Sequence, residues 1–180
     1  MPIVDGDFIA RYTSEQLADG SFVHVPIIDG TNTDEGVAFG PQGVNSTAVF
    51  VADVTRNTTQ AYIGPQFAQG VLDAYPKVCG EYYVPGPEEV PCDFVYPASY
   101  GDSAEYRRSA AYFGDVVMSA NRRAVVTGWA AHGVPAYSYR FNTLPAGLPY
   151  YVGVVHFQEV AWVFDNVNGL GYDALHGTIK

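Results

Sequence analysis

Apolar residues recur along this chain with two different spacings, and their alternation predicts an α/β protein. The segment 22–29 (FVHVPIID) is apolar and β-rich and lies between two glycines, which indicates a buried strand. The alternating stretch 136–141 (AYSYRF) predicts a second strand, and the apolar run 150–155 (YYVGVV) predicts a third. Because the third run is apolar at consecutive positions, we expect helices on both faces of its sheet.

Helical spacing occurs in the residues between the first two predicted strands. Residues 65–75 predict a short helix, and a helix from about Arg122 should end at the glycine and proline of 133–135. We expect the arginine pairs 107–108 and 122–123 to lie on solvated helix faces. The strongest helix signal follows a capping Asp102 or Ser103 and has four apolar residues at helical spacing: Tyr106, Ala110, Phe113 and Val117.

Residues 76–101 contain five prolines and predict a long surface loop. The 180 residues are enough for one domain, and we interpret the whole chain as a single segment. It is 48% hydrophobic and 16% charged, as in globular proteins. A formal net charge of −10 argues against nucleic acid as a partner. No apolar run approaches the roughly 18–20 residues of a transmembrane span.

Two kinds of signal indicate secretion. Asn45 and Asn57 begin N-glycosylation triplets, although such triplets also arise by chance. Cys79 and Cys92 flank a loop rich in proline and glycine, and are either a disulfide or two unpaired buried thiols. The first ten residues (MPIVDGDFIA) are no signal peptide, so we expect a secreted-type chain that is a piece of something larger.

Chemistry-bearing residues follow two of the predicted strands. Asp34 and Glu35 come after the first, and His156 comes after the third. The carboxyl ends of strands in an open parallel sheet commonly hold ligand sites, so a carboxylate could orient this histidine as a general base. A core histidine with a satisfied hydrogen bond is the other interpretation. No His or Cys pair has the spacing of metal ligands, so we expect no metal and no cofactor.

Four stretches, in order, resemble the type-B carboxylesterase/lipase family, the cholinesterase-like α/β-hydrolases, in its fungal form. They are MPIVDGDFI near the start, VPIIDGTNTDEGVAF at 25–39, the helix–helix–strand segment 112–141, and YYVGVVHFQEVAWVF at 150–164. The resemblance implies the C-terminal portion of an α/β-hydrolase fold, with a mixed, mostly parallel sheet flanked by helices. It also implies that Glu35 is the acid and His156 the base of a Ser-Glu-His triad. Asp34 remains an alternative acid, and Glu159 is a candidate hydrogen-bond partner near the base.

One part of the family pattern is missing. The nucleophile elbow G-x-S-x-G precedes the acid in this fold, and no such sequence occurs in the 180 residues; the glycine-rich oxyanion loop is missing too. We therefore expect the C-terminal part of a secreted ester hydrolase that acts on small-molecule or lipid esters together with its N-terminal remainder and is inactive alone. A non-catalytic cholinesterase-like adhesion module is the alternative. An incomplete sheet would also favour self-association through its exposed edge.

Overall fold

The computed structural model of the chain describes residues 3–56, 61–77, 91, 93–145 and 148–165. The chain forms two compact units. The first combines Met1–Gly30 with Ala120–Tyr139, and the second combines Thr31–Ser119 with Arg140–Lys180. Among the described residues, no helix is both long enough and apolar enough to cross a membrane.

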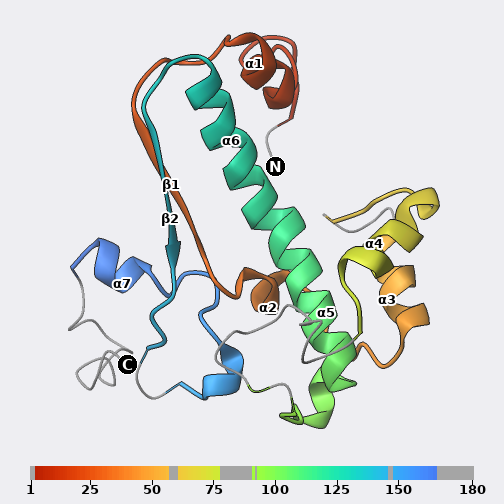
Figure 1. The fold of residues 1–180 in the computed structure, drawn as a ribbon. Helices are drawn as coiled ribbons and strands as arrows, with labels where there is room; N and C mark the ends of the chain where they lie inside the picture. The colour runs from red at the N-terminus through yellow and green to blue at the C-terminus, as the bar shows by residue number, and fades with distance from the viewer. Residues whose placement is uncertain (1–2, 57–60, 78–90, 92, 146–147, 166–180) are drawn as a thin grey trace. The chain divides into compact units, whose positions relative to one another are not determined.

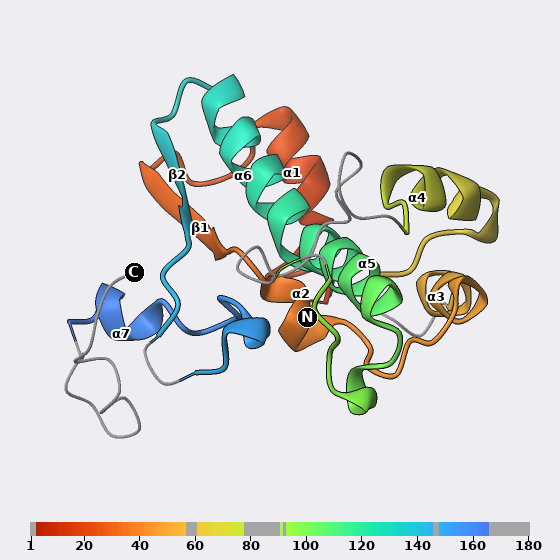
Figure 2. The same ribbon diagram turned by 60° about the horizontal axis from the view of Figure 1, so that its bottom comes forward.

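Strands β1 (Ile27–Asn32) and β2 (Ala136–Phe141) form a two-stranded parallel sheet and run side by side in both views (Figures 1 and 2). The Ile27 N–H donates to the Pro135 carbonyl and the Thr33 N–H donates to the Phe141 carbonyl, each at 3.1 Å. Strand β2 confirms the prediction for 136–141. Strand β1 begins later than predicted, and its predicted burial is wrong, because Ile28 is 75% exposed where no described element covers it.

The third predicted strand, 150–155, is wrong. Tyr150–Val152 form a 3₁₀ turn, labelled η4, directly after Pro149. The next residue, Gly153, has φ of +74°, which favours glycine and lies outside the region of a regular β-strand. Val154 then hydrogen-bonds to Asp34 rather than to a neighbouring strand. The apolar residues of this run therefore pack as part of a turn, not as a strand.

The first unit is built on helix α6 (Ala120–Ala131), against which helix α1 (Thr13–Asp19) packs. Phe22 stacks on Trp129 of α6 with ring centroids 4.0 Å apart. The Trp129 indole N–H donates to the Val25 carbonyl at 2.9 Å, which secures the segment before β1. As predicted, the helix ends at a glycine, because Gly133 has φ of +72° and Pro135 cannot continue the helix.

The second unit holds most of the helices. The predicted helix after Asp102 is confirmed as α5 (Ser103–Gly114), with the Asp102 carboxylate accepting from the Glu105 N–H at 3.0 Å. A π-helical stretch, Asp115–Ser119, follows it. The prediction for 65–75 is also confirmed, as a 3₁₀ turn followed by α4. The elements not yet named are α2 (Glu35–Phe39), α3 (Thr47–Val54), η1 (Pro65–Phe67), α4 (Ala68–Ala74), η2 (Ala98–Tyr100) and α7 (Val160–Val163).

The main hydrophobic core of this unit lies where α3 and α4 pack on the same side of α5 (Figures 1 and 2). The rings of Phe50 and Tyr112 meet edge to face at 5.8 Å, and the Tyr112 hydroxyl donates to the Ala61 carbonyl at 2.7 Å. Its fully or nearly fully buried members are Val44, Phe50, Val54, Ala61, Tyr112 and Phe113. The core thereby holds α5 in place beside the loop that follows β1.

The arginine pair of α5 is buried, so the predicted solvated face is wrong. Arg107 and Arg108 are 1% and 3% exposed. The Arg108 guanidinium forms an ion pair with Glu105, which is itself fully buried and also accepts from the Thr47 hydroxyl at 2.8 Å. Arg107 lies over the Tyr96 ring, 5.3 Å from its centroid. A guanidinium can be buried when its charge is paired and its N–H groups form hydrogen bonds. The spacing of residues along a helix does not show whether such partners are present.

Helices α2 and α5 touch through their backbones. A Cβ atom at Gly36 would lie well inside van der Waals contact with the Ala110 carbonyl, and one at Gly114 would lie 2.9 Å from the Gly36 nitrogen. Glycine is therefore required at 36 because a side chain would push the two helices apart.

We expect Gly36→Ala to lower the free energy of unfolding by about 2 kcal/mol or more, because the new methyl group must displace α2 from α5. Gly70→Ala is the matched control, since a Cβ in α4 would meet open space. That control should raise stability by roughly 0.5–1 kcal/mol, the usual gain of alanine over glycine in a helix. Urea unfolding followed by circular dichroism measures both, and equal effects of the two substitutions would contradict the close contact.

Arg108→Met should lower the free energy of unfolding by about 3–5 kcal/mol, because it leaves the Glu105 carboxylate buried without its main countercharge. Lys77 lies 3.3 Å from Glu105 but is partly exposed. Arg11→Met removes an exposed ion pair with Asp19 and should have a much smaller effect in the same urea titration. Similar losses for the two arginines would refute a buried charge centre in α5.

Candidate active site

Glu35 lies at the first position of α2, immediately after the loop that follows β1, and is 3% exposed. Its two carboxylate oxygens have different partners. Oε1 accepts the backbone N–H of Asn32 at 2.7 Å, and Oε2 lies 2.8 Å from Nδ1 of His156. A carboxylate held at both oxygens cannot rotate freely, so its orientation toward the histidine is set by the turn in which it lies.

His156 comes from the loop after η4 and not from the end of a strand. Its side chain is 36% exposed, so the imidazole is held at Nδ1 and is partly open to solvent. When Nδ1 donates its proton to Glu35, the neutral ring carries its free lone pair on Nε2. Nε2 makes no hydrogen bond to any residue that the structure describes. This arrangement can accept a proton at Nε2 and stabilise the resulting imidazolium through Glu35.

Asp34 joins the two loops by a pair of hydrogen bonds. Its backbone N–H donates to the Val154 carbonyl at 2.9 Å, and its Oδ2 accepts the Val154 N–H at 2.7 Å. A Cβ atom at Gly153 would collide with Oδ2, so glycine is needed there both for its left-handed φ and for this close approach. Of the two adjacent carboxylates, Glu35 contacts His156, whereas Asp34 binds backbone two residues before it.

Asn32 is a site residue that the sequence analysis missed. Its side-chain amide donates to the Val155 carbonyl at 2.7 Å and to Oε2 of Glu159 at 2.6 Å. Asn32 is 3% exposed, whereas its partners Val155 and Glu159 are partly exposed. Glu159 was expected near the base, and the structure brings it to the site through Asn32. The signal that could have identified Asn32 is its place three residues before Glu35, at the end of β1.

A small cluster of aromatic side chains packs against η4. Tyr151 stacks on Phe94 with centroids 5.5 Å apart, and Phe94 meets Tyr96 edge to face at 5.2 Å. Tyr106, 1% exposed, packs against Tyr96 at 4.7 Å. Burial raises the pKa of Tyr106 far above its ordinary value, and the nearby tyrosines and Asp34 add to this.

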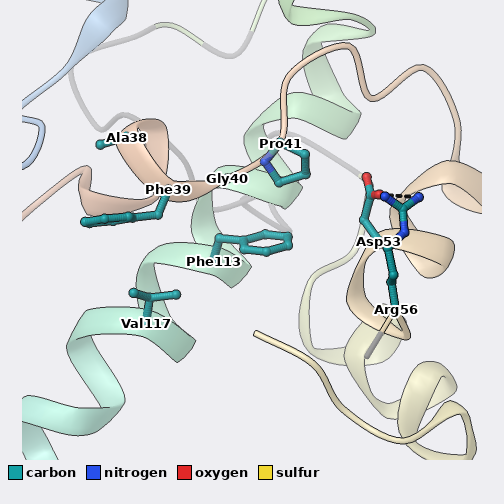
Figure 3. A pocket seen from close by; sticks show the side chains of 8 residues that line it. All are labelled: Ala38, Phe39, Gly40, Pro41, Asp53, Arg56, Phe113 and Val117. Carbon is teal, nitrogen blue, oxygen red and sulfur yellow. Dashed lines mark ion pairs between the residues drawn. The ribbon is translucent and has the colours of Figure 1, made fainter. Parts of the chain in front are cut away.

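An open pocket of about 390 Å³ lies beside α2 (Figure 3). Figure 3 shows Phe39 and Pro41 near Phe113 of α5 on one side of the pocket. The ion pair of Asp53 and Arg56, whose charged atoms lie 3.4 Å apart, is on the other side. Phe39 also meets the His156 ring edge on, at 4.9 Å. The same phenyl ring thus borders both the pocket and the histidine.

The remaining predicted sites are two glycosylation triplets and one cysteine pair. Asn45 is exposed in the loop before α3. Asn57, Cys79 and Cys92 lie outside the described residues. In the part of the chain that the structure describes, no group of three or more His, Cys, Asp or Glu side chains is placed to hold a metal ion.

Comparison with known proteins gives a consistent result. The chain is 30% identical over 167 residues to the acylcarnitine hydrolase of Rattus norvegicus and 26% identical over 171 residues to a secreted lipase of Arthroderma benhamiae. These alignments cover 90% and 93% of this chain but only 27% of each relative. The crystal structure of EstA from Aspergillus niger superposes on all of this chain with a TM-score of 0.69, at 21% identity, and the match covers 30% of EstA.

These matches confirm the predicted fold class, part of an α/β-hydrolase, and they show that the chain spans about a quarter of its curated relatives. The sequence model of the carboxylesterase family matches residues 1–174, which is nearly the whole chain. The predicted resemblance is thereby confirmed: the chain belongs to the carboxylesterase family.

Proposed function

We propose that this chain is the C-terminal part of a secreted carboxylic-ester hydrolase and supplies the acid and base of a Ser-Glu-His triad. The observation that carries the proposal is the 2.8 Å contact between Oε2 of Glu35 and Nδ1 of His156. The buried carboxylate is further held by the Asn32 N–H, and the histidine side chain is partly exposed. A pair built in this way matches the orienting half of a serine hydrolase triad.

In this mechanism a serine hydroxyl attacks the ester carbonyl while Nε2 of His156 accepts its proton. Glu35 stabilises the imidazolium that forms and keeps the ring in the tautomer that presents Nε2. The imidazolium then protonates the departing alkoxide, which leaves an acyl-enzyme. Water attacks the acyl-enzyme with the same histidine as base, and the serine is restored. No metal or organic cofactor is needed for any of these proton transfers.

The nucleophile and the oxyanion hole must come from another segment, because the 180 residues contain no G-x-S-x-G sequence. We take that segment to be the N-terminal remainder of the same hydrolase. The length of the relatives, of which this chain matches 27%, supports this. The two-stranded sheet leaves strand edges unpaired among the described residues, so the remainder, or a second copy of this chain, can pair there.

The substrates in this proposal are carboxylic esters of small-molecule or lipid type. Secretion of the hydrolase is supported by the similarity to a secreted lipase and by the exposed position of Asn45, which suits a glycan. A disulfide between Cys79 and Cys92 and a second glycan at Asn57 complete the proposal. A non-catalytic adhesion module would have no use for a histidine and a buried carboxylate held at hydrogen-bond distance, so the geometry favours the enzyme.

Replacement of the two adjacent carboxylates tests the assignment of the acid. In the longer hydrolase that carries this segment, Glu35→Gln should lower kcat about 10⁴-fold, because an amide cannot stabilise the imidazolium. Asp34→Asn is the matched control, since its amide oxygen can still accept the Val154 N–H, and it should retain most activity. Hydrolysis of p-nitrophenyl acetate measures both, and the reverse order of effects would make Asp34 the acid.

A second readout is independent of turnover. Proton NMR of the 180-residue chain should show a low-field Nδ1 proton of His156 bound to the carboxylate. This resonance should persist in Asp34→Asn and disappear in Glu35→Gln. If Glu35→Gln left the resonance unchanged, the Glu35–His156 pair would not exist in solution.

The chain alone should not react with a fluorophosphonate serine probe, because it has a base but no activated serine. After addition of the N-terminal segment, the label should reside on that segment, as read from intact masses under denaturing conditions. A label on the 180-residue chain itself would place the nucleophile here and overturn the division of the triad.

A further inference from the structure

Phe157, the residue after the candidate base, has φ of +78°. Among the described non-glycine residues only Asp165 shares a positive φ, and a bulky side chain in this region strains the backbone. The Phe157 side chain is nevertheless 63% exposed, so its burial does not compensate for the strain. A strained and exposed aromatic residue beside a catalytic group points to a role in function.

The ring of Phe157 lies against the His156 imidazole, with centroids 5.6 Å apart and planes at 61°. The Phe39 ring also meets this imidazole edge on, at 4.9 Å and 62°. Phe39 is 39% exposed, so both phenyl rings reach solvent beside the same histidine. Because Glu35 occupies the Nδ1 edge, these two rings form the apolar surroundings of a histidine whose Nε2 edge remains available.

This inference rests on the proposed function, in which Nε2 protonates the departing alkoxide. The carbon substituent of that alkoxide must then lie within a few ångströms of the histidine, since proton transfer requires hydrogen-bond distance. We propose that Phe157 is a specificity-determining residue that, with Phe39, forms an aromatic wall for the alcohol part of the ester. The wall favours aromatic alcohols over linear alkyl alcohols, because phenyl rings pack edge to face against an aromatic substituent.

Acetate esters test this, with benzyl acetate compared to butyl acetate because their leaving alcohols have similar basicity. In the longer hydrolase, Phe157→Gly should lower the benzyl-to-butyl ratio of kcat/KM roughly tenfold, the loss of one aromatic contact. Phe157→Tyr keeps the ring and should preserve the ratio. The ratio of butyl butyrate to butyl acetate varies only the acyl part and should not change in either variant.

A parallel measurement uses the 180-residue chain without turnover. Benzyl alcohol should shift the His156 ring resonances in an NMR titration, and 1-butanol at equal concentration should shift them less. The benzyl alcohol response should be lost in Phe157→Gly and kept in Phe157→Tyr. Phe157→Gly should also have a higher unfolding midpoint than Phe157→Ala, because glycine accepts the left-handed φ without strain.

The outcomes separate this inference from the function on which it rests. If wild-type hydrolase cleaves esters but Phe157→Gly lowers kcat/KM equally for both alcohols, Phe157 packs against protein and the inference fails while the function stands. If the wild-type hydrolase cleaves no ester, the proposed function fails. An unchanged benzyl alcohol response in Phe157→Gly would refute the aromatic wall in either case.

Discussion

Where α2 meets α5, the backbone of Gly36 lies against the backbone of Ala110 and Gly114, with no room for a side chain between them. Glu35 is the residue before this contact, so the position of its carboxylate depends on how closely the two helices approach. The hydrophobic core of α3, α4 and α5 holds α5 on its other side. The geometry of the Glu35–His156 pair therefore depends on packing that reaches well beyond the two residues themselves.

Three polar side chains, from the last residue of β1 to the first residue of α2, have three separate tasks. Glu35 contacts the imidazole, Asp34 binds the backbone of Val154, and Asn32 binds the Val155 carbonyl together with Glu159. These side chains thus hold the loop that carries His156 on both sides of the histidine. Val154 and Val155 are bound before it, and Glu159 is bound after it. Asn32, Asp34 and Glu35 are each 3–5% exposed, so removal of one of these side chains leaves the groups bound to it without that hydrogen bond.

Some large apolar residues of the structure are exposed to solvent. Ile28 on β1 is large and apolar yet open to solvent, and β1 and β2 have no further neighbouring strand among the described residues. The match to EstA covers all of this chain but only 30% of EstA. Buried features such as the Arg108–Glu105 ion pair, by contrast, are complete within the second unit.

The sequence by itself determined the features that depend on residues close together in the chain. Asp102 caps α5 through its own side chain, and Gly133 ends α6 through its own backbone, so local patterns predicted both. The motifs around Glu35 and His156 identified the family. Only the tertiary structure decided which carboxylate meets the histidine, that Asn32 joins the site, that Arg108 is buried and that residues 150–155 turn. The Glu35–His156, Asn32–Glu159 and Thr47–Glu105 hydrogen bonds join residues far apart in the chain, and spacing along one segment does not show which distant residues pack against it.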